Sequence, residues 1–205
     1  MSSPYRLLGI CGSLRANSFS CAVLTALAKA VAAKAEFECA DVGAVPHFNH
    51  DLFVDPLPQG VRALHDQIAA ADGLLIVSPE YNHGIPGHLK NAIDWASRPG
   101  YDGPFKHKPI KIMTIATSPL GGARAQAWLN EVFASTLSRV VPGKQVIVGG
   151  VEAKVKDGKL AHEDTLIFAL NSIDDLLDEA CLVQGRPKRV IPDAWQRRKL
   201  DKPPR

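Results

Sequence analysis

The chain has 205 residues, enough for one domain with a substantial core, and its composition is that of a soluble globular protein. Hydrophobic residues make up 46% and charged residues 22%, with a formal net charge of +3 at pH 7. No apolar run reaches the roughly 18–20 residues of a transmembrane helix, and the N-terminus lacks a secretory signal pattern. We therefore expect a cytoplasmic protein with no membrane contact.

Much of the positive charge lies in residues 186–205, a basic tail that contains proline. This tail has neither a nucleic-acid recognition motif nor a basic helical stripe, so we expect no nucleic-acid partner. Residues 1–185 contain no internal repeat and no linker. They are predicted to form a single domain that the tail follows.

The first third of the chain alternates between strand and helix patterns. It predicts a strand at Tyr5–Cys11, a helix from Phe19 to Val31 capped by a serine or asparagine, and a strand at Phe37–Val42. A long loop over 44–60, rich in proline, histidine and aspartate, is expected to be functional or to form an irregular cover. A second helix follows over Val61–Ala71.

The same alternation continues to the C-terminal region. Gly73–Ser78 is a continuous apolar run, as expected for a strand covered on both faces, and a helix follows over His88–Ala96. The remaining predicted elements are a strand at Ile110–Thr117, a helix from Gly121 to Ser138, a strand over 144–150 and a helix from Asp164 to Val183. Five such βα units predict an α/β fold, a doubly wound five-stranded parallel sheet with helices on both faces.

Ligands of doubly wound sheets bind at the carboxyl ends of the strands, where the strand order reverses. That rule selects the loops over 12–20, 78–87 and 117–124, which are also the most distinctive stretches of the sequence. The three loops are therefore expected to surround one ligand.

The first loop, GSLRANSFS, has features of a phosphate site at the start of a helix. It contains neither G-x-G-x-x-G nor G-x-x-x-x-G-K-[ST]. Instead, Ser13, Ser18 and Ser20 offer hydroxyls and Arg15 offers a fork of N–H donors, a set suited to a terminal phosphate. In the simpler alternative, Ser18 only caps the helix and Arg15 is a solvated charge.

The other two loops have features that suit a planar ring. Tyr81, Asn82 and His83 present flat or polar groups, and His83 is interpreted as a surface residue or a contact to a ligand edge. Glu80 has no paired carboxylate and is not predicted to be a general base. In the third loop, Ser118 can bond a ring carbonyl, although a plain turn with a helix cap is the alternative.

Together, GSLRANSFS, SPEYNHGIPGHLKNAIDW and TSPLGGARAQ resemble the NADPH-dependent FMN reductases of the flavodoxin-like fold. This group includes bacterial quinone, chromate and azo-dye reductases. The resemblance extends from about Leu7 to Val183 and has one departure, since Ser20 stands where many relatives have asparagine. It implies the sheet order 2-1-3-4-5 and a bound FMN.

The resemblance assigns cofactor-binding residues and neither a metal nor a catalytic side chain. Around the FMN phosphate it places Ser13, Arg15, Ser18, Phe19 and Ser20. Bordering the isoalloxazine ring it places Pro79, Glu80, Tyr81, Asn82 and His83. Closing the other side of the flavin it places Ser118, Gly121 and Gly122.

The resemblance also implies ping-pong hydride transfer from NADPH or NADH to flavin N5 and then to a quinone, flavin, azo compound or chromate. The alternative is a flavodoxin-type electron carrier without NAD(P)H turnover. Arg124, His83 and the tail are candidate contacts for the 2′-phosphate of NADPH. A homodimer or homotetramer is expected, with the loop over 44–60 and the helix over His88–Ala96 as contact surfaces.

The four cysteines are Cys11, Cys21, Cys39 and Cys181, and no two form a C-x-x-C pair. Each lies in or beside an apolar run. We expect all four to be buried, reduced thiols.

Overall fold

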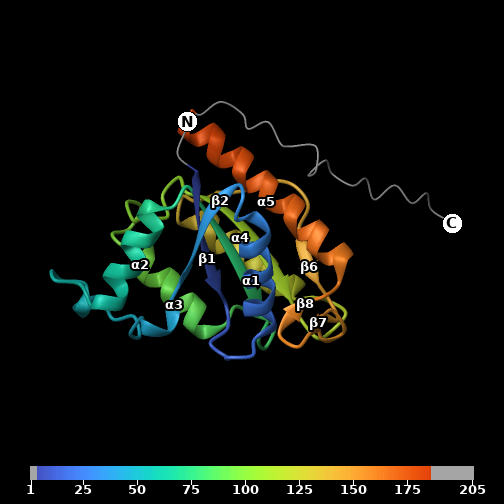
Figure 1. Ribbon diagram of the computed structural model, residues 1–205. Coiled ribbons are helices and arrows are strands. Elements are labelled where there is room, and N and C mark those ends of the chain that lie inside the picture. Colours follow the sequence, from blue (N-terminus) through green and yellow to red (C-terminus); the bar gives the residue numbers. More distant parts are fainter. Residues whose placement is uncertain (1–3, 186–205) are drawn as a thin grey trace.

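The centre of the protein is a parallel sheet (Figure 1). The structure is a computed structural model that describes residues 4–185. The strands of the sheet are β1 (Tyr5–Cys11), β2 (Ala35–Ala40), β3 (Gly73–Pro79), β4 (Pro109–Ile115), β5 (Arg139–Val140) and β6 (Val146–Val148). Their order is β2-β1-β3-β4-β5, with β6 also paired to β4. The predicted flavodoxin-like α/β fold and strand order are confirmed.

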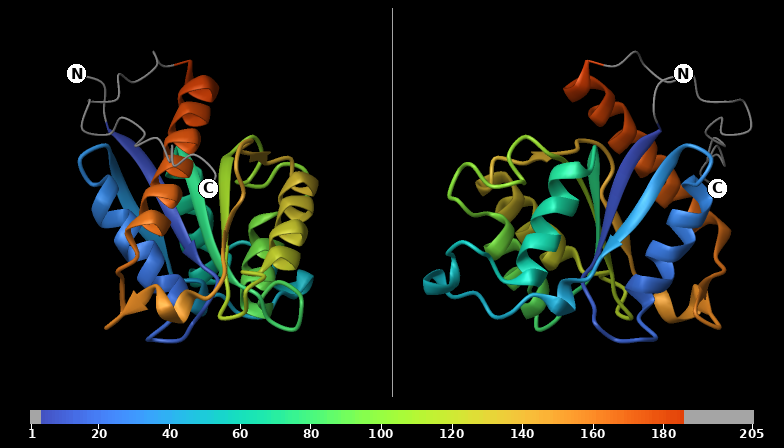
Figure 2. Two further views of the ribbon diagram at one scale, coloured as in Figure 1. Left: turned by 90° about the vertical axis from the view of Figure 1, so that its right-hand side faces the viewer. Right: turned by 60° about the vertical axis from the view of Figure 1, so that its left-hand side comes forward.

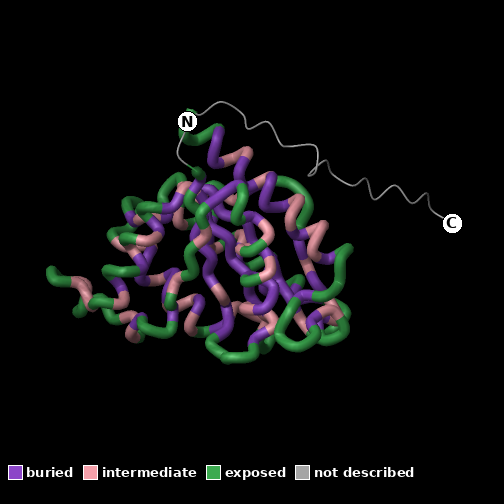
Figure 3. Tube along the Cα trace, in the orientation of Figure 1, coloured by how far each residue is buried: buried purple, intermediate pink, exposed green. Residues whose placement is uncertain are grey.

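The central strands β1, β3 and β4 are almost wholly buried because each face of the sheet packs against helices (Figures 1 and 2). In β3, Leu75 and Val77 point into one core, and Leu74 and Ile76 point into the other. The first core is covered by α1 (Phe19–Val31) and α5 (Glu163–Gln184). The second is covered by α2 (Gln59–Ala70), α3 (Gly87–Ala96) and α4 (Ala123–Ser135). Figure 3 shows the buried strands between the two helical layers.

One edge of the sheet differs from the prediction of a single strand over 144–150. β5 pairs with the first residues of β4, Pro109 and Ile110, whereas β6 pairs with Met113–Ile115 near its end. An exposed segment over 142–145 separates the two short strands. It contains Pro142, which has no N–H to donate to a ladder, and Gly143 at φ +117°.

Smaller elements were absent from the prediction. They are the short helices η1 (Val42–Ala44), η2 (His50–Leu52) and η3 (Val151–Ala153), and a hairpin of β7 (Val155–Lys156) with β8 (Lys159–Leu160). η1 explains why β2 ends two residues before the predicted boundary. The Asp41 carboxylate accepts a hydrogen bond from the Gly43 N–H at 3.0 Å and turns the chain out of the strand.

The loop over 44–60 is fastened to α3. The Asn91 side chain accepts a hydrogen bond from the Phe48 N–H at 2.7 Å and donates one to the Pro46 carbonyl at 2.9 Å. The indole N–H of Trp95 donates to the same carbonyl at 2.8 Å. Trp95 is fully buried, so it is a core residue of this chain. The loop therefore includes an irregular cover over α3.

The prediction of four buried thiols is wrong for Cys39, which is exposed on β2. Cys181 is buried, and Cys11 and Cys21 are half-buried. Among the described residues, no helix combines the length and the apolar character that a bilayer crossing requires. The predicted tail, residues 186–205, lies outside the described residues.

Candidate functional site

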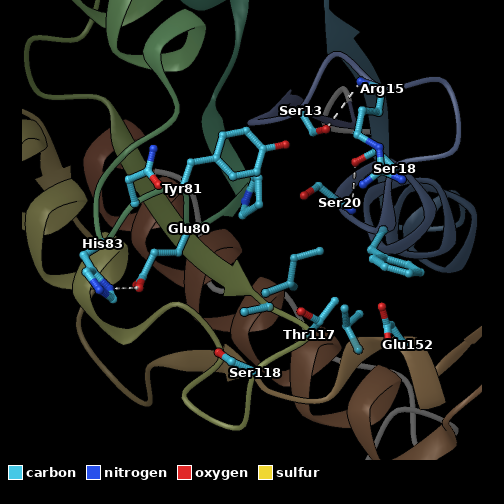
Figure 4. A pocket seen from close by; sticks show the side chains of 16 residues that line it. Ser13, Arg15, Ser18, Ser20, Glu80, Tyr81, His83, Thr117, Ser118 and Glu152 are labelled. Atoms are coloured by element: carbon cyan, nitrogen blue, oxygen red, sulfur yellow. Dashed lines mark hydrogen bonds and ion pairs between the residues drawn. The ribbon is translucent and has the colours of Figure 1, made fainter.

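A cavity of about 590 Å³ lies at the carboxyl ends of β1, β3 and β4, where the three predicted loops meet (Figure 4). Its volume is in the range of small-molecule sites. The predicted residues that line it are Ser13, Arg15, Ser18, Phe19, Ser20, Pro79, Glu80, Tyr81, Asn82, His83 and Ser118. In Figure 4 the serines and Arg15 of the first loop lie across the cavity from Glu80, Tyr81 and His83.

The N-terminus of α1 forms one wall of the cavity. Ser18 is its N-cap, and its Oγ accepts hydrogen bonds from the N–H groups of Ser20 at 3.1 Å and Cys21 at 3.4 Å. Ser13 Oγ accepts a hydrogen bond from the Arg15 N–H at 3.4 Å. The positive end of the α1 dipole and the hydroxyls of this loop therefore face one space, as an anion site requires.

Two groups in this wall fit a bound phosphate. Ser20 is 1% exposed, and its Oγ has no hydrogen-bond partner within residues 4–185. A buried, unpaired hydroxyl costs about 1–3 kcal/mol, which a phosphate oxygen would offset. The Arg15 side chain is exposed, and no carboxylate in the described part of the chain forms an ion pair with it. Ser20 and Arg15 are thus free to contact an anionic ligand.

Gly12 sets the position of this loop. Its N–H donates to the Val77 carbonyl at 2.8 Å, so the first loop leaves the sheet in contact with β3. A Cβ on Gly12 would lie 2.5 Å from Ser78 Oγ and 2.8 Å from Ser78 Cα. Only glycine allows this approach of the two strand ends.

The second loop ends in a tight turn at the opposite wall. Tyr81 and Gly84 exchange two backbone hydrogen bonds of 3.1 and 2.9 Å. Between them, Asn82 and His83 have φ values of +49° and +63°, as a type I′ turn requires of its two central residues. The His83 side chain is 73% exposed, which agrees with its interpretation as a surface or ligand-edge residue.

Glu80 ties the second loop to the third. Its Oε2 accepts hydrogen bonds from the N–H groups of Arg124 and Ala125, both at 3.0 Å. The N-cap of α4 is Gly122, which has no side chain, so Glu80 caps this helix from another loop. Glu80 Oε1 also lies 3.4 Å from the Nδ1 of His83, whose ring contacts the Arg124 guanidinium.

These donors determine the protonation of Glu80. Burial raises the pKa of this carboxyl, but the hydrogen bonds from Ala125, His83 and Arg124 outweigh it, so the pKa lies below its usual value. Glu80 is thus an ionised carboxylate with its lone pairs engaged. This arrangement supports the prediction that it is not a general base.

We predict that Glu80→Gln destabilises the protein at pH 7 by about 1–2 kcal/mol, because α4 loses a charged cap. A lowered folded-state pKa gives stability that is complete above the unfolded-state pKa and is lost as pH falls through the folded value. The difference from wild type should therefore shrink in acid. Urea unfolding across the acid range measures it, with the exposed cavity residue Glu152 changed to Gln as control. A difference that is independent of pH would contradict this role.

The third loop contributes less to the cavity than predicted, and neither Gly121 nor Gly122 lines it. Their φ values are +61° and +87°, and a Cβ on Gly121 would lie 2.6 Å from the Ile147 side chain. These glycines bend the chain into α4. The cavity residues that sequence reasoning missed are Ile115, Ala116, Thr117, Val151 and Glu152.

Comparisons with known proteins agree with this geometry. Residues 5–153 match the family described as NADPH-dependent FMN reductase. The NAD(P)H-dependent FMN reductase of Pseudomonas aeruginosa is 42% identical over 133 residues, 65% of this chain and 71% of that protein. A quinone reductase of Escherichia coli is 39% identical over 171 residues, 81% of this chain and 90% of that protein.

A third relative and a solved structure extend the comparison. The 2-hydroxy-1,4-benzoquinone reductase of a Burkholderia species is 38% identical over 166 residues, 80% of this chain and 90% of that protein. Among solved structures, the flavoenzyme NAD(P)H:(acceptor) oxidoreductase FerB of Paracoccus denitrificans superposes with a TM-score of 0.77 and 31% identity. That match covers 86% of this chain and 97% of FerB.

Proposed function

We propose that this chain reduces quinones in a ping-pong cycle. It belongs to the NADPH-dependent FMN reductase family and is an oxidoreductase that uses FMN and NAD(P)H. Bound FMN supplies the two-electron chemistry that connects NAD(P)H to the acceptor. The observation that carries the proposal is that residues of all three family motifs line the same cavity. Two relatives named for quinone reduction favour a quinone over the other acceptors.

In this proposal the first loop binds the FMN phosphate. The hydroxyls of Ser13, Ser18 and Ser20 and the Arg15 guanidinium surround the phosphate oxygens, with Phe19 beside them. Two observations support this assignment. Within the described residues, the Ser20 hydroxyl has no hydrogen-bond partner and the Arg15 side chain forms no ion pair. A terminal phosphate needs such a set of hydroxyls and one cation rather than a glycine-rich pyrophosphate loop.

The second and third loops orient the isoalloxazine ring. Pro79, Tyr81, Asn82 and His83 border one side, on a turn that Glu80 holds against α4. Ser118 closes the other side with its hydroxyl, and Thr117 lies between Ser118 and Glu152 along this wall of the cavity (Figure 4). Because Glu80 is engaged as a cap, no acid–base role in hydride transfer is assigned to it.

An anaerobic titration tests the function. We expect NADPH or NADH to bleach the visible absorption of the FMN-loaded protein, and a benzoquinone added afterwards to restore it. Initial rates at several quinone concentrations should then give parallel double-reciprocal lines. Intersecting lines would overturn the ping-pong order. A flavin that neither nucleotide bleaches would instead favour the flavodoxin-type carrier.

The proposal includes the nucleotide, the assembly and the location of the enzyme. Arg124 and His83 contact each other beside the cavity and are candidate ligands of the NADPH 2′-phosphate. A cytoplasmic homodimer or homotetramer is proposed. The loop over 44–60 supports the assembly of subunits, because its apolar side chains Leu52 and Val54 are 44% and 61% exposed.

A further inference from the structure

Two cysteines meet at the base of the phosphate-binding loop. Cys11 is the last residue of β1, and Cys21 lies in the first turn of α1. Their sulfur atoms are 2.8 Å apart, although the residues are joined only through the loop over 12–20. A disulfide bond is about 2.05 Å long, so the sulfurs need to approach by less than 1 Å to form one.

The surroundings of this pair join it to the loop. The carbonyl of Ser13 accepts a hydrogen bond from the Cys11 thiol at 3.3 Å and a longer one from the Cys21 thiol at 3.9 Å. Both cysteines are free and half-buried. The thiols therefore lie directly beneath the residue that begins the serine cluster.

The two sulfurs differ in reactivity. Burial, together with the hydrogen bond and the charge of Cys21, raises the pKa of the Cys11 thiol to about 12. Cys11 is therefore a protonated thiol at neutral pH. Cys21 lies in the first turn of α1, where the positive end of the helix dipole favours a negative charge, so the first attack on a peroxide is assigned to Cys21.

We propose that Cys11 and Cys21 are a redox-active dithiol that a hydroperoxide converts into a disulfide across the base of the phosphate-binding loop. The Cys21 thiolate attacks one peroxide oxygen and breaks the O–O bond, giving a sulfenic acid and a hydroxide that takes up the proton released by the Cys21 thiol to form water. The Cys11 sulfur then attacks the Cys21 sulfur, and the S–O bond breaks. The hydroxyl leaves as water with the Cys11 proton. In sum, two thiols and one hydrogen peroxide give one disulfide and two waters.

The proposal is independent of quinone reduction and adds a modification site. A disulfide here closes a covalent ring around Ser13, Arg15 and Ser18, so the ends of the loop can no longer separate. We expect the oxidised protein without FMN to unfold at a higher temperature than the reduced protein. Reduction with dithiothreitol should reverse the shift.

Peptide mapping tests the bond directly on the FMN-loaded protein. Trypsin cleaves after Arg15, between the two cysteines, and so separates the peptide of residues 7–15 from that of residues 16–29. After treatment with hydrogen peroxide and alkylation of free thiols, we expect these peptides linked and two hydrogens lighter. The free-thiol count should fall from four to two, and dithiothreitol should restore both.

Cys39 provides the matched control, because it is a free cysteine on the surface of the protein. Partial burial of its thiol, followed by the charge of Cys21, raises its pKa, so Cys39 lies near enough to Cys21 to interact with it. Cys39→Ser should keep the 7–15 to 16–29 link, whereas Cys21→Ser should abolish it. Cys11→Ser should leave a sulfenic acid on Cys21 that dimedone traps. Wild-type protein in which peroxide yields no linked peptide, or joins Cys21 to Cys39, would overturn the proposal.

Discussion

Replacing Arg15 with alanine is expected to weaken FMN binding about 10- to 100-fold. The guanidinium is a charged donor to the phosphate, and such hydrogen bonds contribute about 1.5–3 kcal/mol, or one to two factors of ten in the dissociation constant. Titration of the protein lacking FMN, followed by the quenching of flavin fluorescence, measures the loss. At saturating FMN the rate of flavin reduction by NADPH should stay within about twofold of wild type, because Arg15 binds the phosphate and not the ring.

Two controls separate a phosphate contact from general damage. Riboflavin lacks the phosphate, so its affinity should be the same for wild type and Arg15→Ala. Arg124→Ala removes the same charge beside the opposite loop and should leave FMN affinity nearly unchanged. Equal FMN affinity in Arg15→Ala would remove this residue from the phosphate site. A matching loss for riboflavin would indicate a distorted loop instead.

Gly12→Ala is expected to destabilise the protein by about 2–3 kcal/mol and to abolish FMN binding at micromolar concentrations. The new Cβ would lie 2.8 Å from Ser78 Cα, so the end of β1 must move away from β3. Overpacking of this kind typically costs about 1–3 kcal/mol, and here it also displaces the loop that carries the serine cluster. For a chain of this size the melting temperature should fall by about 5–10 °C.

Gly87 is the matched glycine for this experiment. It is the first residue of α3, and its φ is not positive. A Cβ added to Gly87 would meet no heavy atom within 4 Å. Gly87→Ala should leave FMN affinity unchanged and raise stability slightly, since alanine favours a helix. If Gly12→Ala melts and binds FMN like Gly87→Ala, the close packing of the first loop on β3 does not determine its position.

The central fold could be predicted because burial on both faces leaves a plain signal in the sequence. In β1, Leu7 faces one core and Leu8 the other, so residues 7–11 form a continuous apolar run. The bounds of β1 and α1 agree with the structure at both ends. Prediction was poorer at β2, where the polar side chain of Asp41, rather than apolar spacing, ends the strand.

The lining of the cavity was predictable where three loops carry distinctive residues, and less so elsewhere. Val151 and Glu152 follow the short strand β6 and reach the cavity, but their residue types do not distinguish them. Their position after an apolar strand was the available signal. The capping of α4 by Glu80 could not be predicted, because it depends on how two loops far apart in the sequence pack together. The same holds for the approach of Cys11 to Cys21.

The divided edge of the sheet gives the chain a place where its length can change. β5 and β6 are each held by their own pairing with β4, and the exposed residues 142–145 between them belong to neither strand. An added residue in this segment would bulge into solvent and leave the register of β6 intact. Val151 and Glu152 would then keep their places beside the cavity. The segment is therefore a suitable insertion point for a tag or a short peptide in an engineered reductase.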